Sequence, residues 1–154
     1  MFILTIILMG CSDKKELFVS SSNPEIEFSG RIDFTEDKAA EMYWSGSSIK
    51  MNFEGESIQA LLKDESGDNY YNIIIDNKFV SILRADTTKQ YYQLASNLSK
   101  GKHTIELFKR TEWDRGKTSF YGFKINNNAK LLTQSAPKKR KIEFYGNSIT
   151  AGYA

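Results

Sequence analysis

Three residues near the end of the sequence, Gly146, Asn147 and Ser148, have the types and order expected of a nucleophile turn. The short alternating segment 141–144 leads directly into them, and the residues that follow could open a helix. A serine at a strand-to-helix turn exposes its oxygen at the carboxyl edge of a sheet, where open α/β sheets bind ligands. Its backbone N–H, close to a helix N-terminus, can donate to a developing oxyanion, and Gly146 permits the tight turn. The pattern therefore allows Ser148 to act as a catalytic nucleophile, with an ordinary turn or N-cap serine as the alternative.

A second candidate for chemistry is Cys11, which follows an almost wholly apolar run over residues 1–10. A run of this length forms about 15 Å of helix, half of a hydrocarbon core of about 30 Å, so it is no transmembrane helix. Its length matches the core of a signal peptide, and Leu8, Gly10 and Cys11 are placed as in a bacterial lipobox. We expect a lipoprotein signal segment over 1–10, lipidation of Cys11 and a polar tether over 11–24, which would anchor the protein to a membrane of the cell envelope. A buried N-terminal strand with a core cysteine is the alternative.

The composition narrows the chemistry that the rest of the chain can support. With 21 Lys and Arg against 19 Asp and Glu, the net charge is only +2, and we expect no nucleic-acid partner. One cysteine and one histidine are too few for a disulfide framework, a zinc finger or a His-rich metal site, so we expect no metal site of these kinds. Aromatic residues make up 13% of the chain and proline occurs twice, which favours a β-rich body.

From residue 25 onward, short alternating segments are separated by turn residues. Ile49, Met51 and Phe53 alternate with polar residues as in a half-buried strand. Asp76-Asn77 is a two-residue hairpin signal between two apolar strands. Strands repeated at intervals of about 8–12 residues predict a mainly β fold, a β-sandwich of the jelly-roll type over 25–136. The expected strands lie within residues 26–34, 41–44, 49–53, 58–62, 70–75, 79–83, 91–94, 103–109 and 120–125.

The segment after the expected sandwich changes in character. Residues 126–136 are polar and lack periodicity, and Pro137-Lys138-Lys139-Arg140-Lys141 has the composition of a basic linker. The alternating segment 141–144 then leads into the nucleophile turn. We expect residues 137–154 to form this linker and the first strand of an α/β domain.

Two further residues could take part in catalysis or binding. His103, the single histidine, stands at the start of an alternating strand, which indicates a structural or surface residue rather than a general base. Trp113 lies beside a turn and could contact sugar, because pyranose rings present apolar faces to aromatic rings. Core packing is the default for aromatic residues of a sandwich, including the other possible platform residues Tyr43, Trp44, Tyr91 and Tyr92. Acidic residues near the loops match no calcium-loop spacing and are expected to be solvated.

The nucleophile turn resembles the first motif of the SGNH (GDSL-type) hydrolases, which usually reads Gly-Asp-Ser-Ile-Thr where this chain has Gly-Asn-Ser-Ile-Thr. Together with upstream segments, it is similar to carbohydrate esterase family 2 over residues 26–154. In that family a jelly-roll domain precedes an SGNH catalytic domain that removes acetyl groups from plant polysaccharides. The upstream segments are Trp44-Ser45-Gly46-Ser47, Gly101-Lys102-His103-Thr104, Lys109-Arg110-Thr111-Glu112 and Lys141-Ile142-Glu143-Phe144.

The resemblance implies the N-terminal part of an acetylxylan-esterase-like enzyme, with Ser148 as nucleophile and acetylated polysaccharide or oligosaccharide as partner. In SGNH enzymes the catalytic histidine and further oxyanion donors come near the C-terminus, whereas this sequence runs only to Ala154. We therefore expect those groups beyond Ala154, and we expect the chain as printed to be inactive by itself. The alternative function is a non-catalytic β-sandwich lipoprotein that binds carbohydrate or protein.

Overall fold

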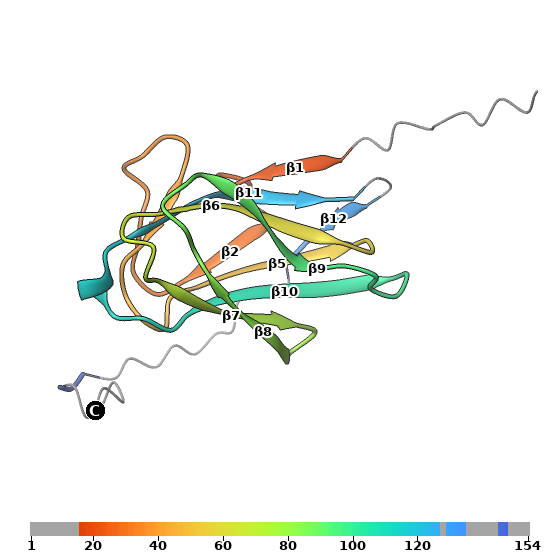
Figure 1. Ribbon diagram of the computed structural model, residues 1–154. Coiled ribbons are helices and arrows are strands. Elements are labelled where there is room, and N and C mark those ends of the chain that lie inside the picture. The colour runs from red at the N-terminus through yellow and green to blue at the C-terminus, as the bar shows by residue number, and fades with distance from the viewer. Residues whose placement is uncertain (1–15, 127–128, 135–144, 148–154) are drawn as a thin grey trace, which may run out of the picture.

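The computed structural model describes residues 16–126, 129–134 and 145–147. Over these residues the chain forms twelve β-strands and one short 3-10 helix, η1. The strands pair antiparallel into two sheets. In Figure 1, β1, β6 and β11 of one sheet lie in the upper part of the molecule, and β10, β7 and β8 of the other lie in the lower part. The elements are β1 (Leu17–Ser20), β2 (Ile26–Ser29), β3 (Ile32–Asp33), β4 (Ala40–Met42), β5 (Ser48–Glu54), β6 (Ile58–Asp64), β7 (Tyr70–Ile75), β8 (Lys78–Arg84), β9 (Gln90–Ala95), β10 (Lys102–Lys109), η1 (Trp113–Arg115), β11 (Thr118–Ile125) and β12 (Lys130–Leu132).

The order of the strands is that of a jelly-roll type sandwich. Sheet A has the order β3-β4-β11-β6-β9, with β1 also paired to β11. Sheet B has the order β12-β5-β10-β7-β8, with β2 also paired to β5. From β4 to β12 the chain crosses from one sheet to the other at each step, apart from the hairpin that joins β7 and β8. The predicted β-sandwich is confirmed.

Alternation along the strands produces the core between the sheets. In β10 the side chains of His103, Ile105, Leu107 and Lys109 are buried, whereas the residues between them are partly exposed. β5 and β6 show the same period of two. The inward side chains of the two sheets form one apolar cluster, whose fully buried aromatic members are Phe53, Tyr71, Phe120 and Phe123.

The expected polar tether over 11–24 is wrong for its second half. Leu17–Ser20 is strand β1, which pairs with the second half of β11 and buries Val19. The close approach depends on Gly122, because a Cβ on that residue would lie 2.2 Å from the carbonyl oxygen of Val19. Three apolar residues within a polar sequence are enough to add a strand where a neighbour leaves room for its backbone. Cys11 and the rest of 1–15 lie outside the described residues.

The expected irregular segment 126–136 is also wrong in part. Lys130–Leu132 is strand β12, which pairs with the end of β5 beside β2. Gly55, in the turn after β5, faces the side chain of Ala129, the residue just before β12. The linker and the strand expected at 141–144 lie outside the described residues.

The hairpin predicted from Asp76-Asn77 joins β7 and β8. Both residues have positive φ, 51° and 62°, as a type I′ turn requires. Asp and Asn tolerate this left-handed region better than most residues, which is why the pair predicts the turn.

Candidate functional site

The residues with predicted roles divide into those that the structure describes and those that it does not. Ser148 and Cys11 lie outside the described residues, so their predicted roles stay predictions. Gly146 and Asn147 are described and exposed. Trp113 lies in η1 and is 60% exposed.

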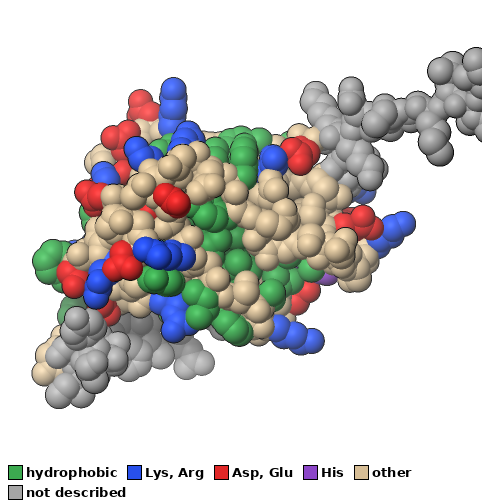
Figure 2. Space-filling view, viewed as in Figure 1, with side chains coloured by type: hydrophobic (Ala, Val, Ile, Leu, Met, Phe, Trp, Pro, Cys, Tyr) green, Lys and Arg blue, Asp and Glu red, His purple; other side chains and the backbone are tan. Residues whose placement is uncertain are grey.

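Trp113 is one of two exposed tryptophans at the same end of the sandwich. Its ring lies 6.3 Å from that of Trp44, centroid to centroid, at an interplanar angle of 37°. Trp44 is 40% exposed in the loop between β4 and β5, and the Arg31 guanidinium lies 5.5 Å from its ring centroid. Ser45 Oγ donates a 2.8 Å hydrogen bond to Glu112 Oε1, which joins the two loops that carry the rings. In Figure 2 hydrophobic side chains project at the end of the molecule where η1 lies in Figure 1.

Core packing was the wrong default for Trp44, Trp113 and Tyr91, whereas Tyr92 packs against the core as expected. Trp44, Trp113 and Tyr91 are exposed, and Tyr43 and Tyr92 are only partly buried. The two tryptophans lie on loops at the end of the sandwich, and Tyr91 faces outward on β9, so none of these three contributes to the core. The sequence suggested Trp113 alone as a sugar contact, and the structure adds Trp44 as its neighbour.

A buried polar network supports the loops beneath the aromatic pair. The Asp64 side chain is buried at the end of β6 and accepts hydrogen bonds from the backbone N–H groups of Ser66 and Gly67, at 3.1 and 2.7 Å. It also accepts from Asn69 Nδ2, at 2.9 Å, and from the hydroxyl of Thr118. The Asp64 carboxylate therefore fixes the turn between β6 and β7 and ties it to the start of β11.

Lys109 extends this network to η1. Its side chain is fully buried, and Nζ donates to Asn69 Oδ1 at 2.6 Å and to the carbonyl oxygen of Thr111 at 2.7 Å. Nζ also lies 3.5 Å from the carbonyl oxygen of Glu112, the residue before Trp113. The inward lysine thus sets the path of the chain into the helix that presents Trp113.

The charge of Lys109 is balanced within this end of the sandwich. Burial lowers the pKa of its amine to about 8, and the carboxylates of Asp64, Glu112 and Asp114 oppose that shift. The signal for this network in the sequence was a lysine at an inward position of a strand otherwise lined by apolar residues. The sequence of the Lys109-Arg110-Thr111-Glu112 segment indicates a family resemblance, but it does not reveal that Lys109 holds the chain leading into η1.

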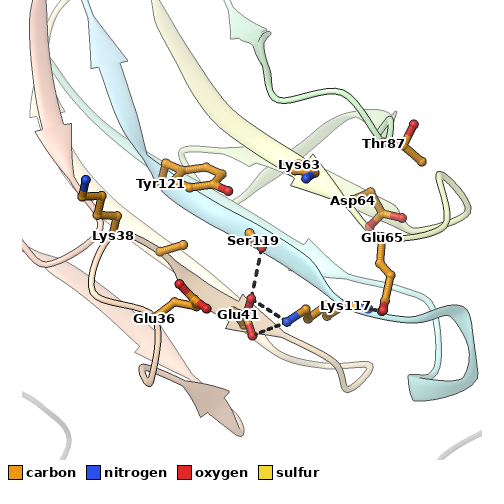
Figure 3. Close-up of a pocket in the computed structure, with 11 residues that line it drawn as sticks. Glu36, Lys38, Glu41, Lys63, Asp64, Glu65, Thr87, Lys117, Ser119 and Tyr121 are labelled. Atoms are coloured by element: carbon orange, nitrogen blue, oxygen red, sulfur yellow. Dashed lines mark hydrogen bonds and ion pairs between the residues drawn. The ribbon is translucent and has the colours of Figure 1, made fainter.

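A polar groove of about 580 Å³ lies on the outer face of sheet A (Figure 3). Glu41 lies within it, and Lys117 Nζ is 2.9 Å from each of its carboxylate oxygens. Ser119 Oγ donates to Oε1 of Glu41 at 3.3 Å. The hydrogen bond to Glu41 raises the pKa of Lys117, and the two side chains form an ion pair. The groove therefore offers a charged surface. Its serine, Ser119, is hydrogen-bonded to the Glu41 carboxylate and not to a histidine, which is the usual partner of a serine nucleophile.

His103, the single histidine, has a structural role, as its place in the sequence predicted. It is buried, with Nδ1 at 2.8 Å from Asp76 Oδ2 and Nε2 at 2.8 Å from the carbonyl oxygen of Ser99. Both partners are acceptors, so the arrangement favours the doubly protonated ring. The bond to Ser99 raises the pKa of His103, the bond and charge of Asp76 raise it further, and burial opposes them.

We expect His103 to make the stability of the domain depend on pH. Because the pKa is higher in the folded than in the unfolded protein, its stabilisation is complete below the unfolded value of about 6.5. That stabilisation is lost as the pH rises through the folded-state pKa. Urea unfolding from pH 5.5 to 9 should show a difference between the wild type and His103→Gln that shrinks with rising pH. A difference that is constant over this range would contradict the assignment.

No group of three or more His, Cys, Asp and Glu side chains suited to a metal ion occurs among residues 16–126, 129–134 and 145–147. The same described part of the chain contains no helix long and apolar enough to cross a membrane.

Comparison with known proteins identifies the class of this sandwich. The family described as "Carbohydrate esterase 2 N-terminal" matches residues 28–135. The chain therefore belongs to carbohydrate esterase family 2, through the N-terminal domain of that family.

Individual relatives agree with this assignment. Cellulase/esterase CelE of Acetivibrio thermocellus is 37% identical over 131 residues, which are 85% of this chain and 16% of the relative. An acetylxylan esterase / glucomannan deacetylase of Cellvibrio japonicus is 24% identical over 152 residues, 96% of this chain and 42% of the relative. A family two carbohydrate esterase from Clostridium thermocellum, solved with cellohexaose, superimposes with a TM-score of 0.74 at 36% identity, over 81% of this chain and 38% of that one. The chain thus spans less than half the length of the relatives that it matches.

Proposed function

We propose that this chain is the N-terminal part of a serine esterase that removes acetyl groups from plant polysaccharide, with Ser148 as the nucleophile. The observation that carries the proposal is the order of the segments. A sandwich matching the N-terminal domain of the family, over residues 28–135, is followed closely by Gly146-Asn147-Ser148. A relative that is 24% identical over 152 residues, 96% of this chain, is named as an acetylxylan esterase / glucomannan deacetylase.

In the proposed reaction the Ser148 oxygen attacks the acetyl carbonyl, and a histidine from the chain beyond Ala154 takes its proton. The ester C–O bond then breaks, the proton passes to the departing sugar hydroxyl, and the acetyl group remains on Ser148. Water, deprotonated by the same histidine, releases acetate. Backbone N–H groups at the nucleophile turn stabilise the oxyanion, and the proposed reaction requires no metal or organic cofactor. His103, the single histidine of the sequence, is not available as this base, because Asp76 and Ser99 bind both of its ring nitrogens.

The reading frame extended past Ala154 provides the test. We expect the extended protein to release acetate from acetylated xylan. A protein that binds polysaccharide but releases no acetate would favour the alternative, a non-catalytic binding sandwich.

We infer that the sandwich itself binds polysaccharide through Trp44 and Trp113. The support is the exposure of both rings, at 40% and 60%, and their joint support by the hydrogen bond between Ser45 and Glu112. Aromatic faces of this kind stack on the apolar faces of pyranose rings, and a relative was solved with cellohexaose. Such a platform would hold the substrate chain near the esterase domain.

Trp113→Ala is therefore expected to weaken binding of cellohexaose or xylohexaose about tenfold, since loss of one stacking contact of about 1.4 kcal/mol corresponds to that factor. Isothermal titration calorimetry with the 154-residue protein measures the change. Tyr91→Ala is the matched control, because Tyr91 is 44% exposed on β9, away from the tryptophan pair. Equal affinities for the wild type and Trp113→Ala, or no binding by the wild type, would rule out the platform.

We also propose that Cys11 carries a lipid anchor and that the protein lies at the cell envelope. The support is the apolar run over 1–10 and the placement of Leu8, Gly10 and Cys11. Expression in a bacterium that processes lipoproteins should give a mature protein that begins with a lipid-modified Cys11. Mass spectrometry that finds an intact Met1 would contradict the anchor.

A further inference from the structure

Strand β8, at the edge of sheet B, exposes three large apolar side chains. Phe79 is 60% exposed, and Val80 and Ile82 are each 51% exposed. We call these three residues the β8 patch. Figure 2 shows hydrophobic side chains reaching the surface in the lower part of the view, where β7 and β8 lie in Figure 1. An apolar group on an edge strand is an aggregation hazard unless something covers it.

The register of β8 against β7 fixes the direction of these side chains. Ile82 lies opposite Asn72, and Phe79 lies opposite Ile74, with a bulge that places Val80 between them. Asn72 and Ile74 face away from the core, because Tyr71, Ile73 and Ile75 on the same strand are buried. Phe79 and Ile82 therefore face outward with them. The patch belongs to the outer face of sheet B.

The chain leaves the sandwich on this same face. Gln134 donates from its backbone N–H to Glu25 Oε2 at 3.0 Å and from Nε2 to the carbonyl oxygen of Glu25 at 2.8 Å. Asn52 Nδ2 donates to Gln134 Oε1 at 3.2 Å. Asn52 points outward from β5, since Met51 and Phe53 on either side of it are buried. Gln134 is thus fixed against the outer face of sheet B.

The distance from the end of the described sandwich to the β8 patch can be compared with the length of the linker, residues 135–140. From β5 to β8 there are two intervening strands, β10 and β7, so the strands are about 15 Å apart. Residues 135–140 can span at most about 20 Å when fully extended. A linker of this length is therefore long enough for a domain that begins at Lys141 to reach the β8 patch. In the relative solved with cellohexaose, this chain covers only 38% of the whole, so a large further domain is available in that protein.

We propose that the β8 patch is the docking surface for the esterase domain that continues this chain beyond Lys141. The proposal rests on the proposed function, which supplies that domain. Lys78 and Arg84, at the two ends of β8, are exposed and give the patch a charged rim, as at most domain and protein interfaces. Docking here would bury the apolar edge and hold the two domains in a fixed relation.

Hydroxyl-radical footprinting of two proteins, the 154-residue chain and the chain extended past Ala154, tests the proposal. Phe79 and Ile82 should be oxidised at least about fivefold more slowly in the extended chain, because the core of an interface excludes water. Phe34 is the matched internal control, since it is 59% exposed and its ring packs against Phe28 of β2. β2 pairs with β5, and the strands β10 and β7 separate β5 from the edge that β8 forms. The oxidation rate of Phe34 should be the same in both proteins.

A variant separates docking from other causes of protection. In the extended chain, Phe79→Glu should return the oxidation rate of Ile82 to its value in the 154-residue protein, whereas Phe34→Glu should not. Equal rates for Phe79 in the two wild-type proteins would overturn the proposal. Protection that disappears on dilution would also overturn it, in favour of a second copy of the chain. Acetate release by the extended chain tests the proposed function separately, so an active esterase with an unprotected patch would exclude only the docking.

Discussion

Ser148→Ala, introduced into the chain extended past Ala154, is expected to lower kcat for acetate release from acetylated xylan by about 10⁴-fold or more. Without the serine oxygen no covalent acetyl intermediate can form, and the remaining groups can only bind and polarise the ester. Stability should change little. At the predicted strand-to-helix turn, the hydroxyl of Ser148 would contribute at most a helix cap, worth about 1 kcal/mol.

Two further variants distinguish the nucleophile from its neighbours. His103→Gln should leave the acetate-release rate within a few-fold of the wild type, because both nitrogens of His103 are bonded inside the sandwich. Asn147→Asp, which restores the residue usual in SGNH hydrolases, should be tolerated. Near-normal turnover by Ser148→Ala would refute the assignment of the nucleophile. So would a His103→Gln protein that is folded but inactive.

The strands that the sequence predicted well are those with a strict alternation of buried and exposed residues. β5, with Ile49, Met51 and Phe53, and β10, with Ile105 and Leu107, show that pattern in the structure. β1 and β12 were missed because each is short and pairs with only part of its neighbour. Such strands form only where another element leaves space for them. For β1 that space exists because Gly122 on β11 has no side chain. This space cannot be read from the short segments themselves.

The exposed aromatic pair was harder to predict than the core. Sequence composition makes every aromatic residue a candidate for burial, and only the fold shows which ones lie on loops. Trp44 and Trp113 are far apart in the sequence, yet the loops that carry them meet through Ser45 and Glu112. The network of Asp64, Asn69 and Lys109 was missed for the same reason, since its partners come from three different strand ends.

This network provides the prediction with the largest effect on stability. Asp64→Ala should lower the free energy of unfolding by about 4 kcal/mol, because removing a buried charge leaves several donors without an acceptor. These donors include the backbone N–H groups of Ser66 and Gly67 and the side chains of Asn69 and Thr118. Urea unfolding of the 154-residue protein measures the loss.

Asp86→Ala is the matched control for Asp64→Ala. Asp86 also accepts a hydrogen bond from a backbone N–H two residues later, that of Thr88, at 3.3 Å, but it is exposed to water. Water can replace Asp86 as an acceptor, so its removal should cost less than about 1 kcal/mol. Equal losses for the two variants would mean that burial of Asp64 contributes nothing.

Asp64→Ala should also change the packing of the two tryptophan rings. Asn69 Nδ2 donates to Asp64 Oδ2 and also to the carbonyl oxygen of Arg115, the last residue of η1, at 3.0 Å. Loss of the carboxylate removes one of the hydrogen bonds that orient Asn69. It should therefore weaken the contact by which Asn69 holds η1, the helix that carries Trp113. Trp44 and Trp113 are the two tryptophans of the chain, so near-ultraviolet circular dichroism reports on their packing. We expect the tryptophan signal of Asp64→Ala to weaken at urea concentrations where the far-ultraviolet signal of the strands is still intact. Coincident loss of both signals would show that the network stabilises the sandwich as a whole and does not position Trp113.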